Sequence, residues 1–325
     1  MFGIKTRIMR LLAGQVYRGQ FASTGGKPLA ALPLYRKFHL DIPTYDGFGQ
    51  VVHPDIFFDQ TQQRYVLSFT PYPFNDDSHE NPCIAVSDDG IHFREEREGL
   101  NPLARPPEKD HNDDPDISLH DGVYSLVYLE TVRPDYQNVV ALESTDRLNW
   151  ERRVLYRQNL AGSGDIILSP AVIWTGETCR CFFVMGNYGK GHCIRCCSGD
   201  SLAGLDFAGA APVNIDSIPQ SLMPWHLDVF PDGAGGFIML LSLVAHNKDG
   251  KGGRYFLHIA RSRNLTDWKL EPVPVLKNCY RSSGFVKDGV LYIYFSSNFW
   301  GDEWKTGLYK VALPSAEGLS GTGLS

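Results

Sequence analysis

The feature that most constrains the fold of this chain is a hairpin pattern that recurs five times, about every 55 residues. Each copy is a short strand, a polar turn with Gly or Asp, and a second, apolar strand. The copies begin with HPDIFFDQ at 53, DPDISLHD at 114, SPAVIWTG at 169, HLDVFPDG at 226 and RSSGFVKD at 281. Their equivalent positions are Asp55, Asp116, Ala171, Asp228 and Ser283. Repetition at this interval indicates an architecture of similar supersecondary units.

Each hairpin is followed by a polar loop and further strand-like sequence. The phrases IAVSDDGIHF (84–93), VALESTDRLNW (140–150) and IARSRNLTDW (259–268) each predict a third strand, a turn and the start of a fourth. Four strands per unit and five units predict an all-β fold, a five-bladed β-propeller with four-stranded blades.

The repeats also define the domain organisation. We expect one domain over 1–325, with a closure segment at 1–52, blades at 53–313 and a tail at 314–325. The last repeat is short by one strand. A strand from the first 50 residues, for which QVYRGQF (15–21) is the candidate, would complete that blade and close the ring, leaving fewer exposed edges.

Charge and hydropathy exclude several classes of partner. The net charge is -6 and the pI about 5.9, which gives no support to nucleic-acid binding. No apolar run approaches the length of a membrane span. Arg7 and Arg10 interrupt the N-terminal segment, so we expect a cytoplasmic protein, or one exported without an N-terminal signal peptide. The oligomeric state is left open.

Cysteine usage gives no clear metal motif. Five of the seven cysteines fall in CRC (179–181) and CIRCC (193–197), whose spacing fits no standard zinc pattern. Buried, reduced thiols are the simpler interpretation. We expect no cofactor; a structural calcium ion in the central channel is the alternative kept open.

The carboxylates of the first strands are the main candidates for chemistry. First strands line the channel of a propeller, and residues two apart on a strand share a face. Asp55, Asp116 and Asp228 should therefore converge, and three pairs should point the same way: His53 with Asp55, Asp114 with Asp116, and His226 with Asp228. Converging acids shift each other's pKa values apart, so that one serves as base and another as acid.

The loops between second and third strands lie on the same face as the starts of the first strands. They carry the aromatic residues Tyr72, Phe74, Tyr136, Tyr188, Phe299, Trp300 and Trp304 among polar residues. Aromatic rings with hydrogen-bonding neighbours suit sugars. The predicted substrate contacts are His53, Glu80, Asp114, Glu130, Tyr188, Trp225, His226, His246, Arg281 and Trp300.

The phrases PDISLHDGVYSLVY (115–128) and HPDIFF (53–58) resemble five-bladed β-propeller glycoside hydrolases of the family 43 type, over residues 53–313. Other phrases, such as PWHLDVFPDG (224–233) and NCYRSSGF (278–285), resemble a poorly characterised group of propellers associated with bacterial and phage glycan chemistry. The family resemblance implies an Asp general base on blade one, a tuning Asp on blade two and a Glu general acid on blade three. It maps the base onto Asp55 and the tuning role onto Asp116.

The chain departs from this pattern at two places. In the family the blade-one acid usually precedes the proline, whereas here His53 precedes Pro54 and Asp55 follows it. On blade three, Ser169 stands before Pro170 where Glu is expected. Asp228 is the first-ranked substitute for the missing acid because it lies on a channel strand, with Glu80 and Glu130 behind it.

Three functions remain in view. The leading interpretation is a glycoside hydrolase that acts on a bacterial poly- or oligosaccharide by inverting single displacement. The second is a phosphorylase, in which cationic groups hold phosphate; these would be His53, His226, His246, Arg133 and Arg281. The third is a catalytically silent glycan-binding propeller. Arg281 either neutralises the acids or grips a carboxylate on an anionic sugar.

Overall fold

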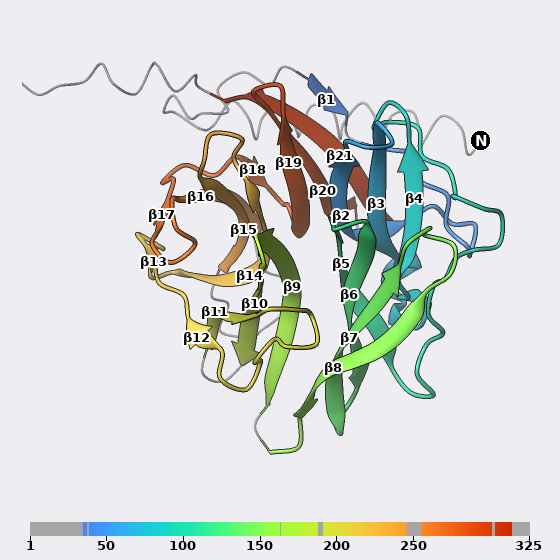
Figure 1. Cartoon of the computed structure of the whole chain (residues 1–325), viewed down its shortest axis with the longest axis horizontal. Coiled ribbons are helices and arrows are strands. Elements are labelled where there is room, and N and C mark those ends of the chain that lie inside the picture. The colour runs from blue at the N-terminus through green and yellow to red at the C-terminus, as the bar shows by residue number, and fades with distance from the viewer. Residues whose placement is uncertain are drawn as a thin grey trace, which may run out of the picture.

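The computed structural model describes residues 35–37, 39–162, 164–187, 191–245, 255–300 and 303–313. Five sheets of mainly antiparallel strands follow one another in chain order around a common centre, with the first long strand of each sheet innermost (Figure 1). These first strands contact one another in a closed cycle from blade one to blade five and back. The predicted five-bladed β-propeller is confirmed.

The blades use the strands that the repeats predict. Blade one holds β2 (Val51–Asp59), β3 (Arg64–Pro71) and β4 (Cys83–Ser87); blade two holds β5 (His111–His120), β6 (Val123–Val132), β7 (Tyr136–Ser144) and β8 (Glu151–Asn159). Blade three holds β9 (Asp165–Thr175), β10 (Thr178–Asn187), β11 (Gly191–Gly199) and β12 (Ala211–Pro212). Blade four holds β14 (Leu222–Pro231), β15 (Phe237–Ala245), β16 (Tyr255–Ser262) and β17 (Trp268–Leu270), joined by β13 (Ile215–Asp216) and β18 (Leu276–Lys277). Blade five holds β19 (Arg281–Lys287), β20 (Val290–Trp300) and β21 (Glu303–Ala312).

Two blades are completed by small additions. In blade one the fourth strand is reduced to a bridge between Val86 and Arg94. In blade five the outer strand is β1 (Tyr35–Lys37), which pairs antiparallel with β21 and closes the ring. A closing strand before blade one was expected, but at 15–21, which lies outside the described residues. Two single-turn 3-10 helices, η1 (Pro73–Asn75) and η2 (Asp77–His79), occupy the loop between β3 and β4.

Apolar side chains fill the spaces between neighbouring blades. Between blades three and four, for example, Phe182 and Val184 of β10 pack with Leu227 of β14 and Leu241 of β15, all fully buried. Burial of this kind on both faces of a sheet stabilises the ring by roughly 25 cal/mol per Å² of apolar surface removed from water. Among the described residues, no helix is long and apolar enough to cross a membrane.

The repeated polar position of the first strands links each blade to the next. The Oδ2 atom of Asp55 accepts the N–H of Ile117, that of Asp116 accepts the N–H of Val172, and that of Asp228 accepts the N–H of Gly284. Ser283 Oγ completes the pattern by accepting the N–H of Ile56. Each donor directly follows the equivalent position of the next blade. Ala171, the fifth equivalent residue, has no side-chain acceptor.

A β-bulge separates residues that the sequence placed on one face. The register of β2 shifts between Val52 and Asp55, and that of β5 between Asp113 and Asp116. The residue before each proline lies at positive φ: 51° for His53 and 51° for Asp114. The extra residue turns its side chain away from the strict alternation of a strand. From the sequence, His53 and Asp55, Asp114 and Asp116, and His226 and Asp228 were expected to point the same way in pairs. The structure places His53, Asp114 and His226 in one cluster and Asp55, Asp116 and Asp228 in another.

Candidate functional site

Three residues at the start of the first strands of blades one, two and four form a buried cluster. His53 of blade one, Asp114 of blade two and His226 of blade four each offer one nitrogen or oxygen atom, and these atoms lie within 4.8 Å of one another. Their side chains are at most 5% exposed. We call these three residues the His–Asp–His cluster.

Neighbouring hydroxyl groups orient both imidazoles of the cluster. His53 Nδ1 lies 3.0 Å from Thr70 Oγ1, and His226 Nδ1 lies 2.8 Å from Ser169 Oγ. The Nε2 atom of each ring is buried and has no hydrogen-bond partner. Outer contacts of this kind fix the tautomer and orientation of metal-binding histidines. His53 faces Asp114 Oδ1 with its Nε2 atom at 3.6 Å, and His226 faces the same oxygen with its Nδ1 atom at 3.4 Å. Two imidazoles and a carboxylate are the kinds of ligand that a divalent transition metal such as zinc takes.

The electrostatics keep Asp114 ionised and the two histidines neutral. Burial raises the pKa of Asp114, but His226, His53, Arg281 and the Ser169 N–H together lower it below its ordinary value. Burial lowers the pKa of His226 to about 4 and that of His53 well below 6.5. A deprotonated carboxylate and neutral imidazoles are the forms that bind metal.

Arg281 is the counter-charge at the centre of the ring. Its Nη1 donates to Asp114 Oδ1 at 2.6 Å, its Nη2 donates to the Pro115 carbonyl oxygen at 2.9 Å, and its side chain is fully buried. Although burial lowers the pKa of Arg281, the carboxylates of Asp114, Asp55 and two further aspartates raise it. With two groups of its fork in use, Arg281 neutralises the acids. The alternative was that Arg281 binds the carboxylate of an anionic sugar. Its guanidinium is fully buried and not exposed to such a ligand.

A second ionisable cluster adjoins the first, because Asp113 and Asp114 are consecutive. His111 Nε2 lies 3.1 Å from Asp113 Oδ2 and 3.6 Å from Glu80 Oε2. Burial lowers the pKa of His111, but its bond to Asp113 and the nearby carboxylates raise it to about 10, so the ring is a cation at neutral pH. Burial raises the pKa of Glu80 well above 4.5, an effect that His111 opposes and Asp113 increases.

Aromatic rings cover the His–Asp–His cluster. The ring of Tyr280 lies 4.7 Å from that of His226 and 5.6 Å from that of His53. Trp225 and Trp304 pack at 6.1 Å and 5.0 Å from Tyr280. Burial raises the pKa of Tyr280 well above 10, so its hydroxyl remains a hydrogen-bond donor. Rings grouped over a polar cluster are a common way to bind the face of a sugar.

The predicted catalytic acids meet in a different part of the channel. Asp55, Asp116 and Asp228 bring one oxygen each within 4.8 Å, at the end of a cavity of about 280 Å³. Its walls are the later residues of the same strands, including Phe57, Trp174 and Phe230, so it lies toward the turns of the hairpins.

The pKa values of all three carboxyl groups are raised above the ordinary value for aspartate. Burial raises the pKa of Asp228 to about 7 and that of Asp116 well above 3.8, and in each case the charge of Asp55 adds to the effect. Burial also raises the pKa of Asp55, against the charge of Arg281. The carboxylates therefore share protons near neutral pH, while their Oδ2 atoms hold neighbouring blades together.

Some of the other predicted substrate contacts lie in or beside the site, and others do not. Trp225 and His226 lie in the site, and Glu80 lies beside it. Glu130 does not: its carboxylate accepts from Asn138 at 2.6 Å and Arg152 at 2.7 Å on the outer strands β7 and β8, so it is no substitute acid. Tyr188 and His246 lie outside the described residues. Trp300 ends β20, and its side chain is outside the description.

Two residues of the site were not predicted. His111 opens the phrase HNDDPD, and a His three positions before an Asp at the start of a channel strand was the available signal. Tyr280 directly precedes Arg281, so its position at the mouth of the channel followed from the same repeat. The cysteines of blade three, by contrast, lie apart from the site; Cys179, Cys181 and Cys197 are buried free thiols in the core.

The fold is that of a five-bladed β-propeller. No family model matches the chain. A curated relative, the A type blood N-acetyl-α-D-galactosamine deacetylase of Flavonifractor plautii, is 24% identical over 330 residues, which span 79% of this chain and 42% of that protein. The chain thus matches less than half the length of this relative.

Solved structures show the same fold. The N-acetylgalactosamine deacetylase from F. plautii, in complex with blood group B trisaccharide, superposes with a TM-score of 0.72 at 18% identity, covering 86% of this chain and 94% of that chain. An endo-arabinase from Bacteroides thetaiotaomicron gives 0.60 at 15%, covering 86% and 99%. The catalytic domain of a Coprinopsis cinerea family 62 α-L-arabinofuranosidase gives 0.60 at 14%, covering 87% and 98%.

Proposed function

We propose that the protein is a hydrolase that removes an acyl group, in the simplest case N-acetyl, from a sugar of a glycan. The observation that carries the proposal is the His–Asp–His cluster, in which both Nε2 atoms are buried and unpartnered. The name of the F. plautii relative, an N-acetylgalactosamine deacetylase, supports the same chemistry.

The same positions argue against hydrolysis of a glycosidic bond. In the glycoside hydrolases that the sequence resembles, a carboxylate precedes the proline on blades one and three. This chain has His53 and Ser169 there, and the Ser169 hydroxyl contacts His226 instead. Glycoside hydrolysis requires a pair of carboxyl groups, one as acid and one as base or nucleophile. In place of that pair this chain has one candidate metal ligand, His53, and one residue, Ser169, that contacts another candidate ligand, His226.

A divalent metal ion held by His53, Asp114 and His226 would supply an activated water and polarise the acyl carbonyl. The chain's own groups do the rest. Burial raises the pKa of Glu80, and the His111 charge opposes this effect. In the proposed reaction Glu80 takes a proton from the attacking water and passes it to the leaving nitrogen. His111, a cation, balances Glu80 when it is ionised. The Tyr280 hydroxyl can donate a hydrogen bond to the developing oxyanion.

A second candidate is the glycoside hydrolase of the original interpretation. The convergence of Asp55, Asp116 and Asp228 in a cavity, with the pKa of Asp228 raised to about 7, favours it. Their nearest oxygens lie within 4.8 Å, however, whereas inversion needs carboxyl groups roughly 6.5–9.5 Å apart to admit a water. Each carboxylate also accepts a backbone N–H that joins two blades. We therefore rank this candidate second and assign the triad to the scaffold.

The test is a parallel assay of acetate and of reducing ends on N-acetylated glycans, with protein stripped by chelator and then given zinc. We expect acetate without new reducing ends, lost on stripping and restored by zinc. The matched variants are Asp114→Asn, which we expect to be inactive, and Asp116→Asn, which we expect to be active. Reducing ends without acetate would establish the second candidate instead. Release of neither product across a broad panel would leave a glycan-binding propeller.

A further inference from the structure

Exposed aromatic side chains gather on blade one beside the site. The described residues include four large apolar side chains that are exposed: Tyr45 at 37%, Phe48 at 55%, Phe74 at 55% and Val154 at 42%. The rings of Phe48 and Phe74 lie 5.4 Å apart in an edge-on arrangement. Tyr45, Phe48 and Phe74 are called the aromatic platform below. Exposed apolar residues scattered singly need no explanation, but a cluster of them marks an interaction site.

The backbone holds this platform in place at a cost. Phe74 lies at φ 56° and ψ 29°, a left-handed conformation that is an outlier for a bulky residue. Its N–H donates to Gln50 Oε1 at 3.3 Å. On the other side, the Tyr45 hydroxyl donates to the His79 carbonyl oxygen at 2.7 Å and accepts from Asn81 Nδ2 at 3.0 Å. Strain of this kind persists only where the surroundings enforce it, and it concentrates at functional positions.

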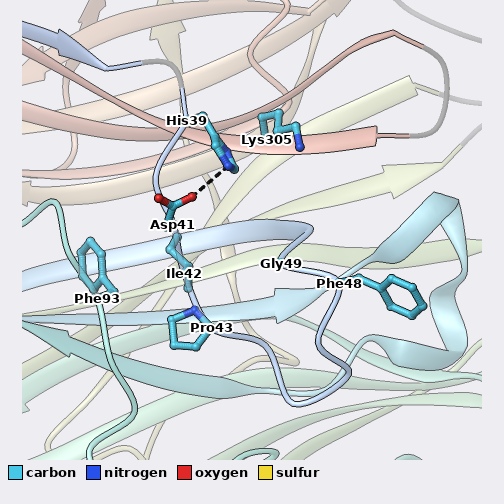
Figure 2. Close-up of a pocket in the computed structure, with 8 residues that line it drawn as sticks. All are labelled: His39, Asp41, Ile42, Pro43, Phe48, Gly49, Phe93 and Lys305. Carbon is cyan, nitrogen blue, oxygen red and sulfur yellow. Dashed lines mark ion pairs between the residues drawn. The ribbon is translucent and has the colours of Figure 1, made fainter. Parts of the chain in front are cut away.

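A pocket continues from the platform along the side of blade one. It has a volume of about 420 Å³, and Phe48 and Phe93 lie toward its two ends in Figure 2. Between them Asp41 pairs with His39 at 3.1 Å, and Lys305 of β21 lies above (Figure 2). Aromatic ends with charged hydrogen-bonding groups between them match the two faces of a sugar: apolar C–H groups and hydroxyls.

A short chain of contacts joins the platform to the His–Asp–His cluster. Gln50 Oε1 accepts both the N–H of Phe74 and the N–H of Trp304. Trp304 Nε1 donates to Asn75 Oδ1 at 2.7 Å, and the Trp304 ring packs on Tyr280, which covers His226. The outer surface of this rim carries the platform, and its inner surface covers the site.

We propose that the platform and its pocket form a binding subsite for further sugar residues of the glycan whose acyl group reacts at the His–Asp–His cluster. The sugar faces pack on Phe48 and Phe74, and Asp41 and Lys305 bind hydroxyl groups in the pocket. The inference rests on the proposed function, and it makes the enzyme one that prefers extended glycans to short ones.

The test compares an N-acetylated oligosaccharide with a single N-acetylated sugar that carries the same reacting group. The double variant Phe48→Ala/Phe74→Ala should raise KM for the oligosaccharide about five- to ten-fold, the scale of two lost ring contacts, and leave kcat unchanged. KM for the single sugar should not change. The single variant Phe74→Tyr, which keeps a ring at this position, should retain most of the wild-type affinity for the oligosaccharide. The control is Val154→Ala on blade two, which removes the fourth exposed side chain and should alter nothing.

The outcomes separate this inference from the proposed function. If wild-type protein is active and the double variant keeps the wild-type KM for the oligosaccharide, the subsite is overturned. If wild-type protein hydrolyses no glycan, the proposed function fails, and titration of the oligosaccharide into both proteins still tests the subsite: equal affinity overturns it. Loss of self-association in the variant, with KM unchanged, would make the platform a protein interface and also overturn the proposal.

Discussion

The Asp114 carboxylate and the Arg281 guanidinium lie 2.6 Å apart at the centre of the ring, although 167 residues separate them in the chain. Both side chains are essentially inaccessible to solvent, at 1% and 0% exposed. A buried charge is tolerated only when it is paired and hydrogen-bonded. Here Asp114 accepts from Arg281 Nη1 and from the Ser169 N–H, while Arg281 Nη2 donates to the Pro115 carbonyl oxygen. The contact between Asp114 and Arg281 spans blades two and five, so that closure of the propeller and assembly of the site are the same event.

The two carboxylates of Asp114 and Asp116 should differ sharply in their effect on activity. Asp114→Asn removes the charge from the His–Asp–His cluster, and we expect acetate release to fall at least about 10²-fold, the scale of a lost metal or electrostatic contribution. Asp116→Asn keeps an oxygen that can accept the Val172 N–H, so activity should remain within a few-fold of wild type. Melting curves for both variants show whether a lost rate reflects unfolding. A larger loss of activity in Asp116→Asn than in Asp114→Asn would place the chemistry in the cavity lined by Asp55, Asp116 and Asp228.

Arg281→Lys tests whether this side chain serves the scaffold or the substrate. Lysine keeps the charge but cannot donate to Asp114 and to the Pro115 carbonyl in the same fork. We expect a loss of about 1–3 kcal/mol in the free energy of unfolding, measured with urea. KM should change equally for neutral and acidic glycans. A KM increase confined to acidic glycans would show that the guanidinium contacts substrate.

Asp228 should make stability depend on pH between about 4 and 7. Its pKa is about 7 in the folded protein against 3.8 for the free side chain, mainly because of burial. In this window the folded state keeps a proton that the unfolded state has lost, so this group's contribution to stability falls as pH rises. Relative to wild type, Asp228→Asn should gain about 1–3 kcal/mol between pH 5 and pH 8.

Asp114→Asn is the matched control for that experiment. The folded pKa of Asp114 lies below its ordinary value, so its stabilising contribution is lost only as pH falls through the acid range. Between pH 5 and pH 8 the cost of Asp114→Asn should therefore stay constant. If the difference in unfolding free energy between Asp228→Asn and wild type also stayed constant between pH 5 and pH 8, the Asp228 carboxyl would be ionised throughout this range. The cavity lined by Asp55, Asp116 and Asp228 would then hold a charge that the structure does not account for.

Gly284→Ala should be among the most damaging single-atom additions to the ring. A Cβ atom there would lie 2.3 Å from the Tyr292 carbonyl oxygen, and the Gly284 N–H donates to Asp228. We expect a loss of about 2–4 kcal/mol in unfolding free energy, from overpacking and a displaced hydrogen bond. Its neighbour Ser283→Ala removes the acceptor for the Ile56 N–H and a hydroxyl that also bonds to Asp55 and Asp228, and should cost about 1–2 kcal/mol. Equal costs would show that the backbone at Gly284 yields easily.

Glu80→Gln should reduce kcat by about 10²–10⁴-fold with little change in KM, the range for a lost acid–base group. Glutamine retains the size and hydrogen-bonding capacity of the side chain but cannot transfer a proton. Glu130→Gln is the control, because that carboxylate binds Asn138 and Arg152 on the outer strands. A loss of activity in both variants, or in neither, would remove Glu80 from the mechanism.

The sequence carried most of the fold because the repeat is long-range and redundant. Five copies of one hairpin set the number of blades, the channel strands and the convergence of Asp55, Asp116 and Asp228, and one misread copy would not have changed the result. The candidate closing strand at 15–21 lies outside the described residues, and the structure shows β1 at Tyr35–Lys37 on the edge of β21. A three-residue strand such as β1 has no periodicity by which the sequence could reveal it. Its partner β21 defines it.

The site was predicted less well, for a local reason. Alternation along a strand is a sound rule until a bulge inserts one residue, and the X-Pro positions of β2 and β5 do so. Alternation therefore placed Asp114 and Asp116 on one face, whereas the structure groups Asp114 with His53 and His226 and groups Asp116 with Asp55 and Asp228. His111 was missed because its partners, Glu80 and Asp113, come together only after the loop between β3 and β4 folds over blade two.

Four of the five equivalent positions bond to the next blade, and Ala171 does not. The boundary between β9 of blade three and β14 of blade four, which lacks this bond, is called the seam below. At the Ala171 position blades three and four are joined by apolar packing. At the mouth, Ser169 Oγ contacts His226 Nδ1, and His192 Nδ1 contacts the Pro224 carbonyl oxygen. A ligand that draws on His226 acts on the first of these contacts directly. Binding at the site and cohesion of the seam are therefore linked quantities, and amide exchange in β9 and β14 should slow when the site is filled. Slower amide exchange in these two strands would then indicate that the site is occupied.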